Sequence, residues 1–136
     1  MIKLIVGKKG SGKTKTLINL VNDALNTTNG AVVCIEKGDK LKFDINYRCR
    51  LIDTEEYLVK DAQALYGFIA GILASNHDVT DIFIDSALKI CQNDTASFDL
   101  FLNELDTLIS THDVNCVITS SIAPEEASST VLKYIA

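Results

Sequence analysis

The glycine-rich run G-K-K-G-S-G-K-T at residues 7–14 is the feature that most constrains this chain. It follows a short apolar segment, I-K-L-I-V at residues 2–6, and leads into residues with helical spacing. A strand, a glycine-rich turn and a helix in this order can point successive backbone N–H groups toward an anion. Glycine suits such a turn because a Cβ would block the close approach of the ligand. The run therefore predicts a β–α unit with an anion-binding turn.

The spacing of this run matches the phosphate-binding P-loop, also called Walker A. Lys13 would place its ammonium on the β- and γ-phosphates and so assist catalysis, while the Thr14 hydroxyl would coordinate Mg²⁺. The positive end of the following helix adds to the attraction. A glycine-rich turn without a ligand and a P-loop that binds without hydrolysing are the alternatives. The residues expected to hold the nucleotide here are Gly7, Lys8, Lys9, Gly10, Ser11, Gly12, Lys13, Thr14 and Lys15.

Length and composition predict a single nucleotide-binding domain over residues 1–136. No apolar run approaches the roughly 18 residues that a membrane span needs. The first residues have no basic segment or cleavage site of a signal peptide, so we expect a cytoplasmic protein without membrane attachment. The four cysteines lack metal-site spacing, and we expect buried free thiols. They are Cys34, Cys49, Cys91 and Cys116.

The net charge of −5 is unevenly distributed along the chain. Residues 1–50 hold ten Lys and Arg against four acids, and residues 51–136 hold three against fourteen. An acidic protein is not expected to bind nucleic acid in general, although a local basic patch could touch a phosphate backbone. A solvated, charge-protected sheet edge is the interpretation we favour for that patch. Its residues are Lys37, Lys40, Lys42, Arg48 and Arg50.

Apolar runs alternate with helical spacing along the rest of the chain, which predicts a doubly wound, mainly parallel α/β sheet with helices on both faces. Helices are expected directly after the P-loop, over 61–75 and around 98–109, and a short helical start at Pro124. Further strands are expected at 31–35, 49–53, 81–85, 116–120 and 131–135, the second of them at the sheet edge.

Asp85 ends the apolar run D-I-F-I-D at residues 81–85. Ligands of parallel α/β sheets bind beyond the carboxyl ends of the strands, so Asp85 is expected at the same edge as the P-loop. There its carboxylate would bind Mg²⁺ directly or through water, which is the Walker B role. An aspartate that merely forms a turn is the alternative.

Three segments together, V-V-C-I-E, D-I-F-I-D-S and C-V-I-T-S-S, resemble the RecA-like ATPases, and the resemblance spans about residues 2–121. It implies that Glu36 activates the attacking water and that Ser120, or less directly Thr119, senses the γ-phosphate. A solvated carboxylate at a strand end is the alternative for Glu36. Such enzymes normally receive an arginine finger at a subunit boundary, and this chain has only Arg48 and Arg50. Slow turnover, or dependence on another copy or a protein partner, is therefore expected.

A second resemblance concerns the deviant Walker motif of the ParA and MinD class. Lys8 stands where that class carries its signature lysine. However, Lys9 replaces a glycine of that motif, and the Glu36–Asp39 segment lacks its D-x-D-like strand end. We therefore rank this resemblance below the RecA-like one.

Three functions remain open from the sequence. The first is a small Mg²⁺-dependent ATPase that uses ATP or GTP, the second a kinase for a small substrate, and the third a nucleotide-controlled switch without productive hydrolysis. The switch stays open because Ser86 stands where many ATPases place a glutamate. Residues 86–97 are the expected mobile or partner-facing segment, with a plain surface loop as the alternative.

Overall fold

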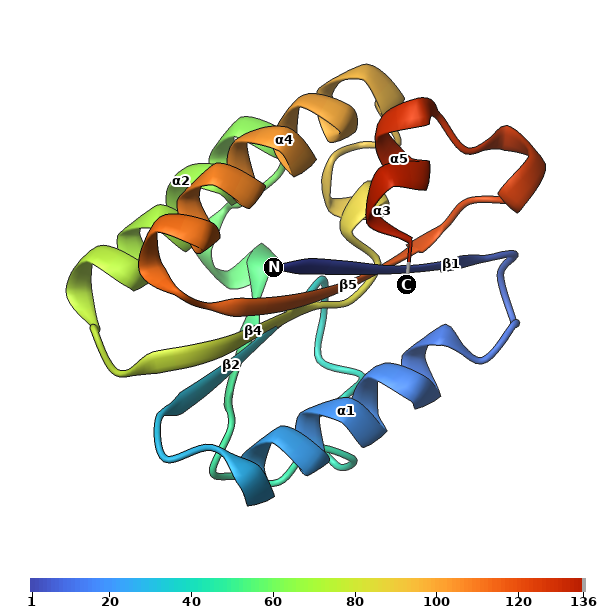
Figure 1. Cartoon of the computed structure of the whole chain (residues 1–136). Helices are drawn as coiled ribbons and strands as arrows, with labels where there is room; N and C mark the ends of the chain where they lie inside the picture. The colour runs from blue at the N-terminus through green and yellow to red at the C-terminus, as the bar shows by residue number, and fades with distance from the viewer. Residues whose placement is uncertain (136) are drawn as a thin grey trace.

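The computed structural model describes residues 1–135 and contains one five-stranded sheet with helices on both faces (Figure 1). The strands lie in the order β1-β5-β4-β2-β3, and every neighbouring pair is parallel. The predicted doubly wound α/β class is confirmed. The elements in chain order are β1 (Ile2–Gly7), α1 (Lys13–Thr27), β2 (Ala31–Glu36), β3 (Arg50–Asp53), η1 (Thr54–Tyr57), α2 (Ala62–Ser75), β4 (Val79–Ile84), α3 (Ala87–Ile90), α4 (Thr95–His112), β5 (Asn115–Ser121), η2 (Pro124–Glu126) and α5 (Ser129–Tyr134).

Two apolar cores lie on opposite faces of the sheet, because neighbouring strand residues point to opposite sides. On one face, α1 packs Leu17 and Val21 against strand residues that include Cys34. On the other face, α2 and α4 lie over the sheet together with the short helices α3 and α5 (Figure 1). Phe98 and Phe101 on α4 are the largest fully buried side chains of this second core. The two cores fix the sheet between helices and leave its carboxyl edge to the loops.

The C-terminal segment differs from the expectation. Residues 131–135 do not form a strand, because Ser129–Tyr134 is the helix α5. Ser128 is the N-cap of this helix, and its Oγ accepts a hydrogen bond from Val131 N at 3.0 Å. Val131 and Tyr134, three residues apart, are buried on one side of it. Only Ile135 pairs like a strand residue, in an isolated bridge to Leu4. The segment is apolar, as expected, but its buried residues have the spacing of a helix and not that of a strand.

Two expectations from composition concern the cysteines and the presence of membrane-spanning helices. All four cysteines are buried and free, as expected. Burial raises the pKa of Cys49 to about 11 and the pKa values of Cys91 and Cys116 to about 12. Among residues 1–135, no helix has the length and apolar character needed to cross a membrane.

The connection between β2 and β3 covers α1 and the sheet without regular secondary structure over most of its length. Its buried residues Leu41, Ile45 and Cys49 are spaced four apart and join the apolar core of α1. The exposed residues between them include Phe43 and Tyr47, which are 88% and 92% exposed. The connection is therefore a packed segment with three apolar anchors.

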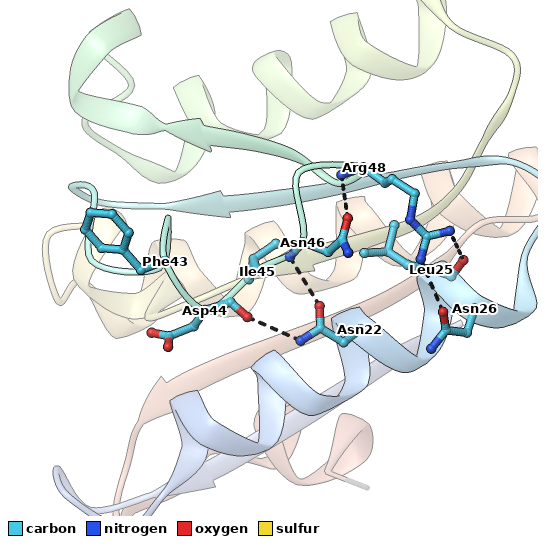
Figure 2. Close-up of a pocket in the computed structure, with 8 residues that line it drawn as sticks. All are labelled: Asn22, Leu25, Asn26, Phe43, Asp44, Ile45, Asn46 and Arg48. Atoms are coloured by element: carbon cyan, nitrogen blue, oxygen red, sulfur yellow. Dashed lines mark hydrogen bonds between the residues drawn. The ribbon is translucent and has the colours of Figure 1, made fainter.

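Side chains of α1 also tie this connection in place (Figure 2). Asn22 Nδ2 donates to the carbonyl of Asp44 at 3.3 Å, and Asn22 Oδ1 accepts from Asn46 N at 3.4 Å. The Arg48 guanidinium donates to the Leu25 carbonyl at 3.4 Å, near the C-terminal end of α1. A cavity of about 310 Å³ lies between the helix and the connection. Because many of its polar groups bond to one another, we assign it a structural role.

Candidate nucleotide-binding site

The predicted P-loop joins β1 to α1 in a glycine-dependent conformation. Gly10 and Gly12 have φ values of 85° and 87°, in the left-handed region that side chains disfavour. Gly12 is the N-cap of α1, and it supplies no side chain to bond the first N–H groups of the helix. These N–H groups and the positive end of the helix dipole are the features that bind anions.

The ammonium of Lys13 lies against its own loop. Its Nζ donates to the Lys8 carbonyl at 2.9 Å and to Ser11 Oγ at 3.4 Å. Both acceptors are neutral oxygens, whereas a phosphate oxygen would form a charge-assisted and stronger hydrogen bond. Lys13 is thus positioned within the loop and can exchange these partners for an anionic ligand.

Thr14 and Asp85, 71 residues apart in the sequence, meet at the carboxyl edge of the sheet. Thr14 Oγ1 donates to Asp85 Oδ1 at 3.2 Å and to Oδ2 at 3.4 Å. Adjacent oxygens around octahedral Mg²⁺ lie about 2.9 Å apart, so a small adjustment would let both side chains bind one ion. Residues 1–135 contain no group of three or more His, Cys, Asp or Glu that could hold a metal. Phosphate and water oxygens would therefore complete the shell, as is usual for Mg²⁺.

A buried hydroxyl holds Asp85 in this position. Thr119 Oγ1, at the end of β5, donates to Asp85 Oδ1 at 2.7 Å and accepts from Ser86 N at 2.8 Å. Ser86 has φ 56°, a left-handed conformation that turns the chain from β4 into α3. Ser120 points elsewhere, since its Oγ accepts from Leu88 N at 3.3 Å. Thr119, rather than Ser120, contacts the expected metal-binding carboxylate.

We expect Thr119→Val to lower the free energy of unfolding by about 1–3 kcal/mol, because a buried N–H and a carboxylate oxygen lose their partner. Valine has nearly the same shape as threonine, so packing changes little. Thr119→Ser, which keeps the hydroxyl, is the matched control. Urea unfolding monitored by circular dichroism measures both variants. If the valine variant is no less stable than the serine variant, the hydroxyl does not have this structural role.

Glu36 lies under the turn that follows β2. The residue is 3% exposed, so in this conformation its carboxylate is buried rather than solvated. Oε1 accepts from Lys40 N at 3.1 Å and Oε2 from Leu41 N at 3.2 Å. The pKa of the Glu36 carboxyl is raised, chiefly by burial and also by the nearby Asp85 and Asp53 carboxylates, although these two hydrogen bonds lower it. In this conformation the carboxylate anchors the turn, and Glu36 does not line the cavity described below.

A cavity of about 670 Å³ opens at the carboxyl edge of the sheet and contains much of the expected site. The expected residues that line it are Lys9, Gly10, Gly12, Lys13, Thr14, Lys15 and Asp85. The expected residues that do not line it are Gly7, Lys8, Ser11, Glu36 and Ser120. Neither Arg48 nor Arg50 lines it. The structure thus brings together most of the residues expected to bind phosphate and both residues expected to bind a metal, whereas Glu36 and Ser120 are buried.

The other residues that line the cavity were not predicted individually. They come from the turn after β2, from the chain after β4 and from the last residue of β5, namely Lys40, Leu41, Ser86, Leu88, Lys89, Asn93 and Ser121. Four of these fall in the 86–97 segment that the sequence placed at the ligand edge. That segment is not a plain surface loop, because α3 buries Ala87 and Ile90 within it. The cavity is lined by five lysines and one carboxylate, a charge balance that suits a polyanion.

The architecture around this site is a small α/β domain with a five-stranded parallel sheet, which is compatible with a P-loop fold. The cavity lies at the edge where ligands of such sheets bind. No protein-family model matches the chain, and no curated protein sequence matches it either.

Proposed function

We propose that this chain is a Mg²⁺-dependent nucleotide-binding domain that hydrolyses ATP slowly. One observation carries the proposal: the Thr14 hydroxyl and the Asp85 carboxylate lie 3.2 Å apart beside a cavity that the G-x-x-x-x-G-K-T loop lines. That pairing of a loop hydroxyl with a carboxylate from another strand is what a Mg²⁺–triphosphate complex requires. The excess of lysines over carboxylates around the cavity supports a polyphosphate ligand.

The residues of the cavity would act mainly by positioning and charge. Lys13 and the free N–H groups of α1 would hold the β- and γ-phosphates, and Thr119 would keep Asp85 oriented through its 2.7 Å hydrogen bond. Bound Mg²⁺ would neutralise charge that develops on the phosphates. Hydrolysis transfers the γ-phosphoryl group to water and releases ADP. The RecA-like resemblance assigns the water-activating role to Glu36, and that role requires the turn above Glu36 to move.

A second candidate is a nucleotide-controlled switch with little hydrolysis. The buried position of Glu36, with both oxygens bonded to backbone amides, favours it. In a switch, the nucleotide stabilises one arrangement of a segment that a partner recognises. A second copy or a protein partner that supplies an arginine would convert such a switch into a faster hydrolase.

The test is to measure binding of ATP and GTP and the release of phosphate, each with and without Mg²⁺. We expect the protein to bind Mg²⁺–ATP and to release phosphate slowly. Glu36→Gln should still bind ADP but release phosphate at least about 100-fold more slowly, the usual effect of losing a general base. A thermal melt of this variant checks that the turn is still folded.

The outcomes separate the candidates. Absence of binding to any nucleotide in Mg²⁺ buffer would overturn both. Tight binding without phosphate release would support the switch. Unchanged turnover in Glu36→Gln would remove Glu36 as the base while leaving the nucleotide site intact.

A further inference from the structure

Cations line the cavity from two sides. Lys9, Lys13 and Lys15 belong to the P-loop and the start of α1, whereas Lys40 and Lys89 come from the turn after β2 and from α3. The P-loop side alone supplies the groups that a triphosphate needs at its β-phosphate. The second side therefore adds positive charge that the motif does not account for.

The backbone around Lys40 is fixed by buried and half-buried carboxylates. Glu36 accepts hydrogen bonds from the N–H groups of Lys40 and Leu41, at 3.1 and 3.2 Å. Asp53 Oδ1 accepts from Gly38 N at 2.8 Å, and Gly38 has φ 99°, which a side chain would disfavour. The Lys40 side chain itself is exposed, and within residues 1–135 its ammonium has no ion-pair partner. The turn thus places a cation at the cavity wall without neutralising it.

Sheet register brings this turn close to the expected metal position. Ile35 pairs with Ile84, and Asp85 N donates to the Ile35 carbonyl at 2.9 Å. The chain that leaves β2 toward Lys40 therefore starts directly beside Asp85. A Mg²⁺–triphosphate held by Thr14 and Asp85 would bring its β- and γ-phosphates to this edge of the sheet, so the terminal phosphate would lie in the cavity that this turn lines.

We infer that Lys40 binds the terminal phosphate of the nucleotide from the turn after β2, and that Glu36, while it holds this turn in the described conformation, is a positioning residue for Lys40. The inference rests on the proposed nucleotide-binding function and adds to it that the site distinguishes ATP from ADP. A cation on the γ-phosphate favours ATP over ADP, because ADP lacks that group. It also places charge where an arginine finger would act, in a cavity that no arginine of the described residues lines.

The experiment measures the dissociation constants of ATP and ADP in Mg²⁺ buffer by calorimetry. Lys40→Ala is expected to weaken ATP binding about 10-fold, the effect of one charge-assisted hydrogen bond, and to change ADP binding less than about twofold. Lys37→Ala is the matched control, since Lys37 is exposed on the same turn but does not line the cavity. Lys40→Arg should keep the preference for ATP.

A double-mutant cycle tests the role of Glu36. Glu36→Gln should reduce the preference for ATP in the parent protein, because glutamine turns an NH₂ group toward one of the two backbone amides. In the Lys40→Ala background the same change should leave the preference unaltered. Lys40→Ala only truncates an exposed side chain, so this variant should fold normally. It therefore still tests the inference if Glu36→Gln folds poorly.

Equal losses of ATP and ADP affinity in Lys40→Ala, or no loss of either, would overturn this inference and leave the proposed function standing. A parent protein that binds neither nucleotide would instead overturn the proposed function itself.

Discussion

Lys13→Ala is expected to weaken ATP binding by about 100-fold. Hydrogen bonds to charged groups contribute about 1.5–3 kcal/mol each, and the lysine of this loop would contact two phosphates. The stability of the fold should change little, because Lys13 bonds only to Lys8 and Ser11 of its own exposed loop. Calorimetric titration with ATP in Mg²⁺ buffer gives the affinity, and thermal unfolding gives the stability.

Lys60→Ala is the control for this variant. Lys60 is exposed and does not line the cavity, so its loss removes one positive charge without touching the site. Its ATP affinity should stay within about twofold of the parent, because exposed charges at a distance are screened by salt. Equal affinities in Lys13→Ala and Lys60→Ala would show that the glycine-rich loop does not bind the nucleotide.

Asp85→Asn should shift the stimulation of ATP binding by Mg²⁺ to higher Mg²⁺ concentrations. The substitution removes the charge but keeps an oxygen that can accept from Thr119, and the Thr14 hydroxyl can turn to accept from the new amide. The structure is therefore retained, while the magnesium concentration for half-maximal stimulation should rise at least about 10-fold, since an anionic ligand is lost. Titration of Mg²⁺ at constant ATP measures the effect.

Without metal, Asp85→Asn should not weaken ATP binding. In EDTA, Asp85→Asn should bind ATP at least as tightly as the parent protein, because a carboxylate no longer faces the phosphates. Asp78→Asn makes the same chemical change at an exposed position at the other end of the β4 strand and should leave both measurements unaltered. A normal magnesium response in Asp85→Asn would remove Asp85 from the metal site.

The parts of the fold and site that are local in the sequence could be predicted. The strand–loop–helix unit around Gly7–Thr14 and the strand that ends just before Asp85 follow from short apolar runs and the chemistry of their ends. The apolar residues of α5 fit a strand as well as a helix, and the local feature that distinguishes the two is the N-cap residue Ser128.

The remainder of the site depends on contacts between distant segments. Whether the Glu36 carboxylate faces water or backbone N–H groups depends on how the turn after β2 folds back over it. The N–H groups that it binds belong to Lys40 and Leu41, and backbone groups are present at almost every position, so the sequence does not mark them as its partners. Likewise, Thr119 and Ser120 are both polar residues at one strand end, and only the pleat of β5 decides which reaches Asp85. Residue patterns within one segment do not determine which side chains of distant segments come into contact.

The enclosed cysteines make site-directed labelling straightforward. Thiol reagents attack the thiolate, and burial raises the pKa values of all four native thiols while the core shields them from reagents. A fluorophore attached after Lys37→Cys would therefore report on the turn beside the cavity in the otherwise native protein. Movement of that turn during a nucleotide titration could be followed in real time, without first removing any native cysteine.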